Sequence, residues 1–216
     1  MEPQELFKSV LVLYDEGKDS TDLVYEIQQC ATEGHPLAQL FLGWCYHFGA
    51  GVTQSNKEAV HWYQEAYKQQ EPSAADWLGN CYACGIGVEQ NYEKALECYS
   101  FAAEHDRPMA QEQLGKMYMM GIGVEQDDEM AALWLRCSCL NPETQALLES
   151  VKQQEHNSCE SRSYSTGNNF SHCSIHAEAF LLLTELTETG RGTEKDALEA
   201  ARLRELAKLL QSKRPD

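Results

Sequence analysis

Four residues with metal-binding side chains form two mirrored pairs in the last third of the chain. They are His156, Cys159, Cys173 and His176, and the members of each pair are separated by two residues. Imidazole nitrogens and thiolate sulfurs are preferred zinc ligands, and two such pairs can complete a tetrahedral site. Zinc would also order a polar segment, because metal binding can supply folding free energy. A zinc site is therefore one hypothesis for this segment, and a Cys159–Cys173 disulfide and an unligated loop are its alternatives.

The other histidines, cysteines and acidic residues show no spacing that suggests an active site. A catalytic nucleophile needs a base within hydrogen-bond reach and a third group that orients the base. The simplest interpretation of His47, His61 and His105 is that they lie on a surface or in a groove. We therefore expect a non-enzymatic protein with no catalytic residue and no cofactor other than the hypothetical zinc. An enzyme of unrecognised type is the alternative.

The charge of the chain argues against nucleic acid as a partner. The net charge is −17, and hydrophobic and charged residues make up 43% and 24% of the sequence, which is typical of a globular protein. Residues 188–216 hold seven basic and six acidic residues, so the rest of the chain holds ten basic and 28 acidic residues. Binding to phosphate groups needs clustered lysines and arginines. An acidic protein with a protein or peptide partner is expected.

The sequence contains no run of about 18 apolar residues, so no membrane span is predicted. The first nine residues carry acids where a secretory signal has a basic region. Nine cysteines is an odd number, and Cys45, Cys81 and Cys98 fall on predicted helices, where a free thiol behaves as a small buried hydrophobe. These features predict a cytoplasmic protein, or one delivered into a host cell by a route without a cleaved signal peptide.

A repeated block makes up the middle of the chain. The pattern Leu-Gly-x-x-Tyr-x-x-Gly-x-Gly-Val begins at Leu42, Leu78 and Leu114, at a constant spacing of 36 residues. A fixed period of this length is typical of solenoids, in which each unit buries its apolar face only by stacking on the next unit.

Each unit is predicted to be a helical hairpin. A proline begins the first helix, where its missing N–H group costs nothing, and a glycine ends it in the left-handed conformation. A polar residue then caps the second helix. The three sets are Pro36, Pro72 and Pro108; Gly49, Gly85 and Gly121; and Ser55, Asn91 and Asp127.

This pattern resembles the Sel-1-like repeat, a relative of the tetratricopeptide repeat. The resemblance is strong over residues 36–138, moderate over 177–212 and weak over 20–34. It implies an α-solenoid that acts as an adaptor or scaffold in protein complexes, with no catalytic residues. One branch of the family is disulfide-stapled, and its pattern would pair Cys30 with position 38, which is Ala38 in this chain.

The predicted fold class is all-α, a right-handed α-solenoid superhelix of stacked helical hairpins. Residues that match the fourth repeat are displaced by 33 positions, which indicates an insertion rich in Ser, Asn and Cys. The predicted organisation is a degenerate capping hairpin (1–34), three repeats (35–71, 72–107 and 108–141), an extra helix with the insertion loop (142–176), and a fourth repeat (177–212).

By analogy with tetratricopeptide stacks, the first helices are expected to line a concave face that binds a partner protein or peptide. Large apolar residues there are typical of binding grooves. The alternative is that they pack against the N-terminal capping helix or against each other. The candidates are Leu37, Leu40, Trp44, His47 and Phe48 in the first unit, Asp76 and Asn80 in the second, and Met109, Glu112, Lys116, Met119 and Met120 in the third.

The predicted function is that of a non-enzymatic adaptor or scaffold that binds proteins through this concave face. The alternative is a metal-responsive or redox-responsive regulator that uses His156, Cys159, Cys173 and His176.

Overall fold

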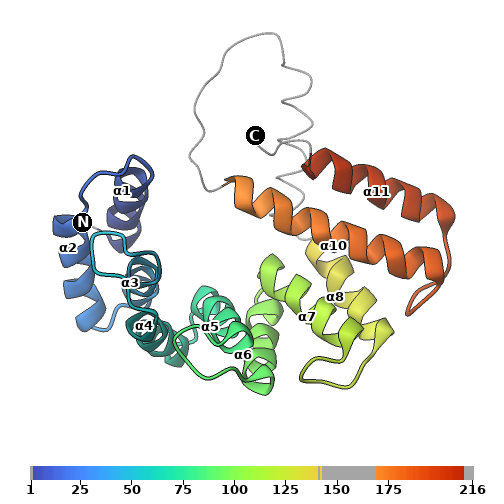
Figure 1. Cartoon of the computed structure of the whole chain (residues 1–216), viewed down its shortest axis with the longest axis horizontal. Coiled ribbons are helices and arrows are strands. Elements are labelled where there is room, and N and C mark those ends of the chain that lie inside the picture. The colour runs from blue at the N-terminus through green and yellow to red at the C-terminus, as the bar shows by residue number, and fades with distance from the viewer. Residues whose placement is uncertain (1, 141, 143–168, 212–216) are drawn as a thin grey trace, which may run out of the picture. The chain divides into compact units, whose positions relative to one another are not determined.

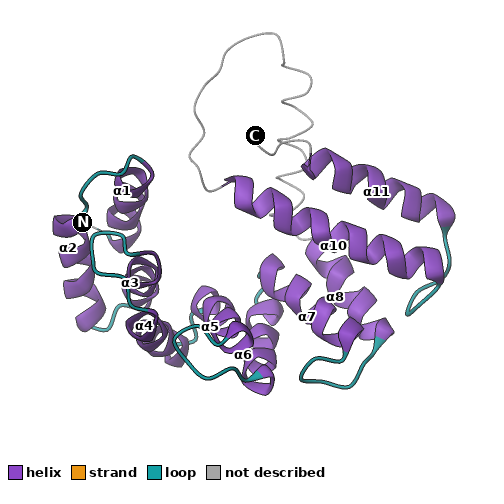
Figure 2. Ribbon diagram, in the orientation of Figure 1, coloured by secondary structure: helices purple, strands orange, loops and turns teal. Residues whose placement is uncertain are grey.

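The structure is a computed structural model that describes residues 2–140, 142 and 169–211, with the backbone alone for residues 169–176, 209 and 210. Every regular element in these ranges is an α-helix (Figures 1 and 2). The all-α fold class is therefore confirmed. The first helices of the hairpins are α1 (Pro3–Asp15), α3 (Pro36–Phe48), α5 (Pro72–Cys84), α7 (Pro108–Met120) and α10 (Asn169–Thr189). The second helices are α2 (Thr21–Thr32), α4 (Asn56–Lys68), α6 (Tyr92–Glu104), α8 (Asp128–Leu140) and α11 (Ala197–Gln211).

The helices form two compact units, Met1–Ala102 (unit 1) and Ala103–Asp216 (unit 2). In unit 1, α3 packs against α4 and also against α2 of the preceding hairpin, and α1 packs against both α2 and α3. In unit 2, α7 packs on α8, α10 packs on α11, and α10 also contacts α7 and α8. Consecutive hairpins are thus stacked on one another within each unit, as in an α-solenoid.

The ends of the helices follow the sequence pattern. Gly85 ends α5 in the left-handed conformation with φ of 69°, and its N–H donates to the carbonyl oxygen of Cys81. The Oγ atom of Ser55 accepts from the N–H of Glu58 at 3.3 Å, and Asn91 Oδ1 accepts from the N–H of Lys94 at 2.9 Å. The predicted helix caps at these positions are therefore confirmed, and they account for the constant length of the turns.

In the three hairpins α3–α4, α5–α6 and α7–α8, a close contact between the two helices depends on a glycine within the first helix. A Cβ atom at Gly79 would lie 2.7 Å from Cδ1 of Tyr99, which is buried. The hydroxyl group of Tyr99 donates to Oδ1 of Asn80 at 3.0 Å. The tyrosine ring therefore lies flat against the α5 backbone because Gly79 has no side chain.

The contact between successive hairpins depends on the second glycine of the Gly-x-Gly turn. A Cβ atom at Gly87 would overlap the carbonyl group of Asn56 at the start of α4. In unit 2, Gly192 approaches the backbone of Asp128 at the start of α8 in the same way. These turns rest on the first turn of the preceding second helix, and only glycine permits the approach.

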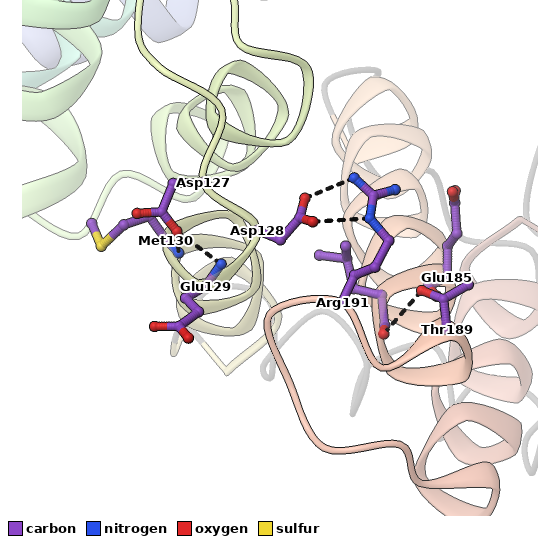
Figure 3. A network of polar contacts seen from close by, with 8 residues as sticks. Asp127, Asp128, Glu129, Met130, Glu185, Thr189 and Arg191 are labelled. Carbon is purple, nitrogen blue, oxygen red and sulfur yellow. Dashed lines mark hydrogen bonds and ion pairs between the residues drawn. The ribbon is translucent and has the colours of Figure 1, made fainter.

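In unit 2 an ion pair accompanies this contact (Figure 3). The guanidinium group of Arg191, the residue between the two turn glycines, donates to both carboxylate oxygens of Asp128 at 2.9 and 2.7 Å. Asp127 next to it caps α8 by accepting from the N–H groups of Glu129 and Met130 at 2.9 and 3.0 Å. The last hairpin is thus attached to α8 through both the backbone and charged side chains.

The last hairpin replaces the Gly–Tyr contact with a different pair. Thr184 takes the place of the helix glycine, and Arg204 takes the place of the tyrosine. Arg204 points to solvent and pairs with Glu188, so no ring needs to lie against the backbone of α10. The buried hydroxyl group of Thr184 donates to the carbonyl oxygen of Phe180 at 2.7 Å, and this bond offsets the cost of burying it.

The insertion differs from the sequence-based expectation at its C-terminal end. A loop was expected up to residue 176, whereas α10 already begins at Asn169, eight residues before 177. The eight residues from 169 contain neither glycine nor proline to stop a helix, which is consistent with this early start. Residues 143–168 lie outside the described part of the chain.

None of the helices in the described ranges combines the length and the apolar character that a membrane span needs.

Substitution of Gly87 by alanine is predicted to destabilise unit 1 far more than substitution of Gly17. Both glycines have left-handed φ values, 72° and 65°, but a Cβ atom at Gly17 would meet no atom within 4 Å. Gly17→Ala should lower the free energy of unfolding by about 1–2 kcal/mol, the cost of the left-handed conformation. Gly87→Ala should lower it by about 3 kcal/mol or more because it also displaces α4. Urea denaturation followed by circular dichroism measures the free energy of unfolding of both variants. An equal decrease in the two variants would disprove the close-contact role of Gly87.

Candidate functional site

The candidate partner-binding residues lie on three first helices, at positions that recur every 36 residues. In unit 1, α3 and α5 carry Leu37, Leu40, Trp44, His47, Phe48, Asp76 and Asn80; in unit 2, α7 carries Met109, Glu112, Lys116, Met119 and Met120. Only Phe48 and Met120 are exposed, and Leu40, Asp76 and Glu112 are buried. The remaining candidates are half-buried.

The structure brings five ring-bearing side chains of unit 1 into one cluster, the aromatic patch. Its members are Tyr14 from α1, Trp44, His47 and Phe48 from α3, and Trp77 from α5. The ring centroids of Trp44 and Phe48 are 4.6 Å apart, and Trp77 lies 6.0 Å from Phe48 and 5.7 Å from His47. Tyr14 and Phe48 expose 39% and 38% of their surface, so part of the patch faces solvent.

Trp44 is held in the patch by α1. Its ring makes edge contacts with Phe7 at 5.2 Å and with Tyr14 at 5.5 Å, and Phe7 stacks on Phe41 at 4.1 Å. The packing against the N-terminal helix, which was the alternative to a binding groove, is therefore present at Trp44. The exposed edge of the patch is formed by Tyr14 and Phe48.

Sequence reasoning missed two members of the patch, Tyr14 and Trp77. Trp77 occupies the repeat position of Phe41, 36 residues earlier, so comparing large residues at equivalent positions could have found it. Tyr14 lies outside the repeats, and no periodic signal predicts that α1 brings it to Trp44.

His47 adds a neutral ring to the patch. Partial burial lowers the pKa of its imidazole below the ordinary value, so the ring is uncharged at neutral pH. The imidazole lies 4.7 Å from the Phe48 ring in an edge arrangement. The patch therefore presents aromatic surface without a positive charge of its own.

The polar candidates of α5 serve the internal structure. Asn80 accepts from the hydroxyl group of Tyr99 and donates from Nδ2 to the carbonyl oxygen of Asp76 at 3.1 Å. Asp76 is 4% exposed. Asp76 is therefore buried within the hairpin, and the half-buried side chain of Asn80 makes hydrogen bonds inside it.

In unit 2, the candidates Glu112 and Lys116 form a buried ion network. Nζ of Lys116 lies 2.7 Å from Oε1 of Glu112 and 2.9 Å from Oε2 of Glu178 on α10. Glu112 is 0% exposed, and its burial raises the pKa of the carboxyl group to about 7, although the charge of Lys116 opposes this shift. The ion pair of Lys116 with Glu178 connects α7 to α10, which is a structural role between successive hairpins.

The methionine candidates are divided between core and surface. Met119 packs against the apolar core formed by α8, α10 and α11, and Met120 is 54% exposed. Met109 is half-buried at the start of α7.

Three repeats of one family account for the central half of the chain. The Sel1 repeat model matches residues 36–71, 72–106 and 108–141, which are the ranges of α3–α4, α5–α6 and α7–α8. The chain is a Sel1 repeat protein.

Solved structures of Sel1 repeat proteins share this fold. A Sel1 repeat protein from Oxalobacter formigenes is 27% identical, with a TM-score of 0.66 over 91% of this chain and 47% of its own. A protective antigen from uropathogenic Escherichia coli with an SLR fold is 29% identical, with a TM-score of 0.60 over 95% of this chain and 45% of its own. The chain thus spans less than half the length of either. No curated protein matches it significantly.

The buried cysteines of the Sel1 repeats are thiols. Burial raises the pKa of the Cys45, Cys81 and Cys98 thiol groups to about 12, so all three are protonated at neutral pH. They fill space in the cores of the hairpins, as the sequence predicts. A protonated thiol is a poor nucleophile and a poor metal ligand.

The side chains of the four zinc candidates lie outside the described part of the structure. His156 and Cys159 fall in residues 143–168, and only the backbone of Cys173 and His176 is described, on α10. Among the described side chains, no group of three or more His, Cys, Asp or Glu could hold a metal ion. The zinc site and the Cys159–Cys173 disulfide therefore stay predictions.

Elemental analysis of the purified protein tests the zinc hypothesis. If zinc is bound by the two pairs, near-stoichiometric metal should be present and should be lost in a His156→Ala/His176→Ala variant. Absence of zinc, together with no change in mass on reduction, would exclude both the zinc site and the disulfide. A variant that changes His61 and His105 to alanine serves as the control.

The free energy of unfolding of unit 2 is predicted to fall as pH rises from 4.5 to 7. The pKa of Glu112 is about 7 in the folded state against an ordinary value of 4.5, so the folded state holds a proton in this range that the unfolded state has released. Stability from this group is fully present below pH 4.5 and lost above about pH 7. The shift corresponds to about 3 kcal/mol.

Glu112→Gln removes the titrating group and should flatten this pH dependence. Glu178→Gln is the matched control, because Glu178 also pairs with Lys116 but is more than half exposed. Urea denaturation at pH 5 and pH 8 measures the difference. An equally steep pH dependence in Glu112→Gln and the parent would contradict the assignment.

Proposed function

We propose that this Sel1 repeat protein is a non-enzymatic adaptor that binds another protein through the aromatic patch of unit 1. The observation that supports the proposal most directly is that tryptophan, tyrosine and phenylalanine rings converge from α1, α3 and α5 at a partly exposed surface. Tryptophan and tyrosine are enriched among the residues that contribute most to protein–protein binding energy.

The patch is also pre-organised. Phe7 of α1 contacts Trp44 and itself stacks on Phe41 of α3. Tyr63, which is fully buried in the hairpin core, stacks at 6.0 Å with Trp77. Side chains already held in place lose little conformational entropy when a partner binds. The exposed rings of Tyr14 and Phe48 are therefore suited to contact a partner at low entropic cost.

A cytoplasmic location is part of the same proposal. The described cysteines are free thiols, and a reducing compartment keeps thiols in this state.

Affinity capture from the native host, compared between the parent and Phe48→Ala, tests the proposal. Removing an exposed aromatic anchor typically costs about 2 kcal/mol of binding free energy, roughly a 30-fold loss of affinity. Phe48 is the last residue of α3 and partly exposed, so its truncation should leave the fold intact, which a denaturation curve checks.

Tyr25→Ala provides the matched control for this experiment. Tyr25 is an aromatic residue of α2 that is 62% exposed and lies outside the patch. Partners should be lost from Phe48→Ala and retained by Tyr25→Ala in quantitative mass spectrometry. Capture of the same proteins by Phe48→Ala and the parent would count against the patch as the binding surface.

A further inference from the structure

We infer that the segment bound by the aromatic patch is basic, and that it places an arginine or lysine side chain against the ring of Phe48. This inference rests on the proposed function and specifies the partner of the same surface. Three features of unit 1 lead to it: its charge, the position of the patch at helix C-termini, and the spacing of the rings.

The first feature is the charge of the unit that carries the patch. Residues 1–102 contain five lysines, no arginine and fifteen acidic residues, which leaves a net charge of −10. A surface with such an excess of negative charge attracts basic partners and repels acidic ones. An acidic peptide is therefore an unfavourable occupant of the patch.

The second feature is the place of the patch at the C-terminal ends of two helices. Tyr14 lies in the last turn of α1, and Phe48 is the last residue of α3. Helix C-termini carry partial negative charge, and the last turn of α1 contains no basic residue to offset it. The exposed carboxylates of Asp15 and Glu16 follow Tyr14 directly, and Glu16 is paired with Lys18 at 2.8 Å. The local potential therefore favours a cation beside the rings.

The third feature is the geometry of the rings. Trp44 and Trp77 lie 4.6 and 6.0 Å from the centroid of Phe48, with interplanar angles of 39° and 85°. A cation within about 6 Å of a ring centroid is attracted by the ring face. A guanidinium or ammonium group placed at Phe48 is thus within reach of more than one ring. The uncharged imidazole of His47 does not repel it.

Unit 1 already contains one interaction of this kind away from the patch. Nζ of Lys94 on α6 lies 5.3 Å from the centroid of the Tyr82 ring on α5. A cation supplied by a partner would make the same type of contact at the patch, where the rings are partly exposed and no cation of the chain is in contact with them among the described residues.

Selection from a random peptide display library on the full-length protein tests the inference. The expected result is enrichment of peptides with arginine or lysine next to apolar residues, with binding that is lost in Phe48→Ala and kept in Tyr25→Ala. Enrichment of neutral or acidic peptides that depend on Phe48 would overturn the inference and leave the proposed function standing. Absence of any peptide that depends on Phe48 would overturn both.

A charge variant separates the electrostatic contribution to peptide binding from the contribution of the aromatic rings. Asp15→Asn/Glu16→Gln should weaken binding of a selected basic peptide about fivefold at low salt, and less at high salt because ions screen exposed charges. The matched control is Asp22→Asn/Glu26→Gln, which removes two acidic side chains from α2. Equal affinities for the two double variants would contradict the role of the α1 terminus. The intrinsic tryptophan fluorescence of the protein, to which Trp44 and Trp77 contribute, reports binding.

Discussion

In three places, close contact between a Gly-x-Gly turn and the first turn of the preceding second helix determines how the hairpins stack. The backbone at Gly51 lies against Ser20 and Val24, that at Gly87 against Asn56, and that at Gly192 against Asp128. Backbone in direct contact leaves no freedom for one hairpin to slide along another. The positions of α1, α3 and α5 in unit 1 follow from these contacts, and with them the convergence of Tyr14, Phe48 and Trp77.

Successive hairpins also share hydrogen bonds that fix their relative position. Gln39 donates to the carbonyl oxygen of Ala31 at 3.2 Å, and Gln111, at the same repeat position two units later, donates to that of Ala103 at the same distance. The next position in the repeat is more variable, since it holds the apolar Leu40 in α3 and the buried acid Glu112 in α7. Among the described residues, Glu112 forms an ion pair with Lys116. Leucine at this position cannot titrate, so its packing is insensitive to pH. Glutamate at this position makes the charge of the ion network around Lys116, which joins α7 to α10, depend on a proton.

The sequence predicts the repeated part of the structure well because its determinants are local. Proline, glycine and polar caps act on the backbone of their own helix, so Gly85, Ser55 and Asn91 could be assigned without knowledge of neighbours. The candidate surface was predicted less completely. Whether Trp44 is open or covered depends on α1, and whether Lys116 meets a second carboxylate depends on Glu178 of α10, and neither helix follows the 36-residue period. The 36-residue period locates equivalent residues, but α1 and α10, which do not follow that period, determine what surrounds some of them.

The turn glycines also define where the chain could be divided into exchangeable modules. The residue pair that forms each close contact belongs to two different repeats, since Gly87 comes from one hairpin and Asn56 from the hairpin before it. A cut between hairpins would separate these two residues. A cassette that runs from a second helix through the following first helix to its Gly-x-Gly turn keeps this pair together, but it separates Gly79 of α5 from Tyr99 of α6, so a crossover at either place breaks one of the two close contacts.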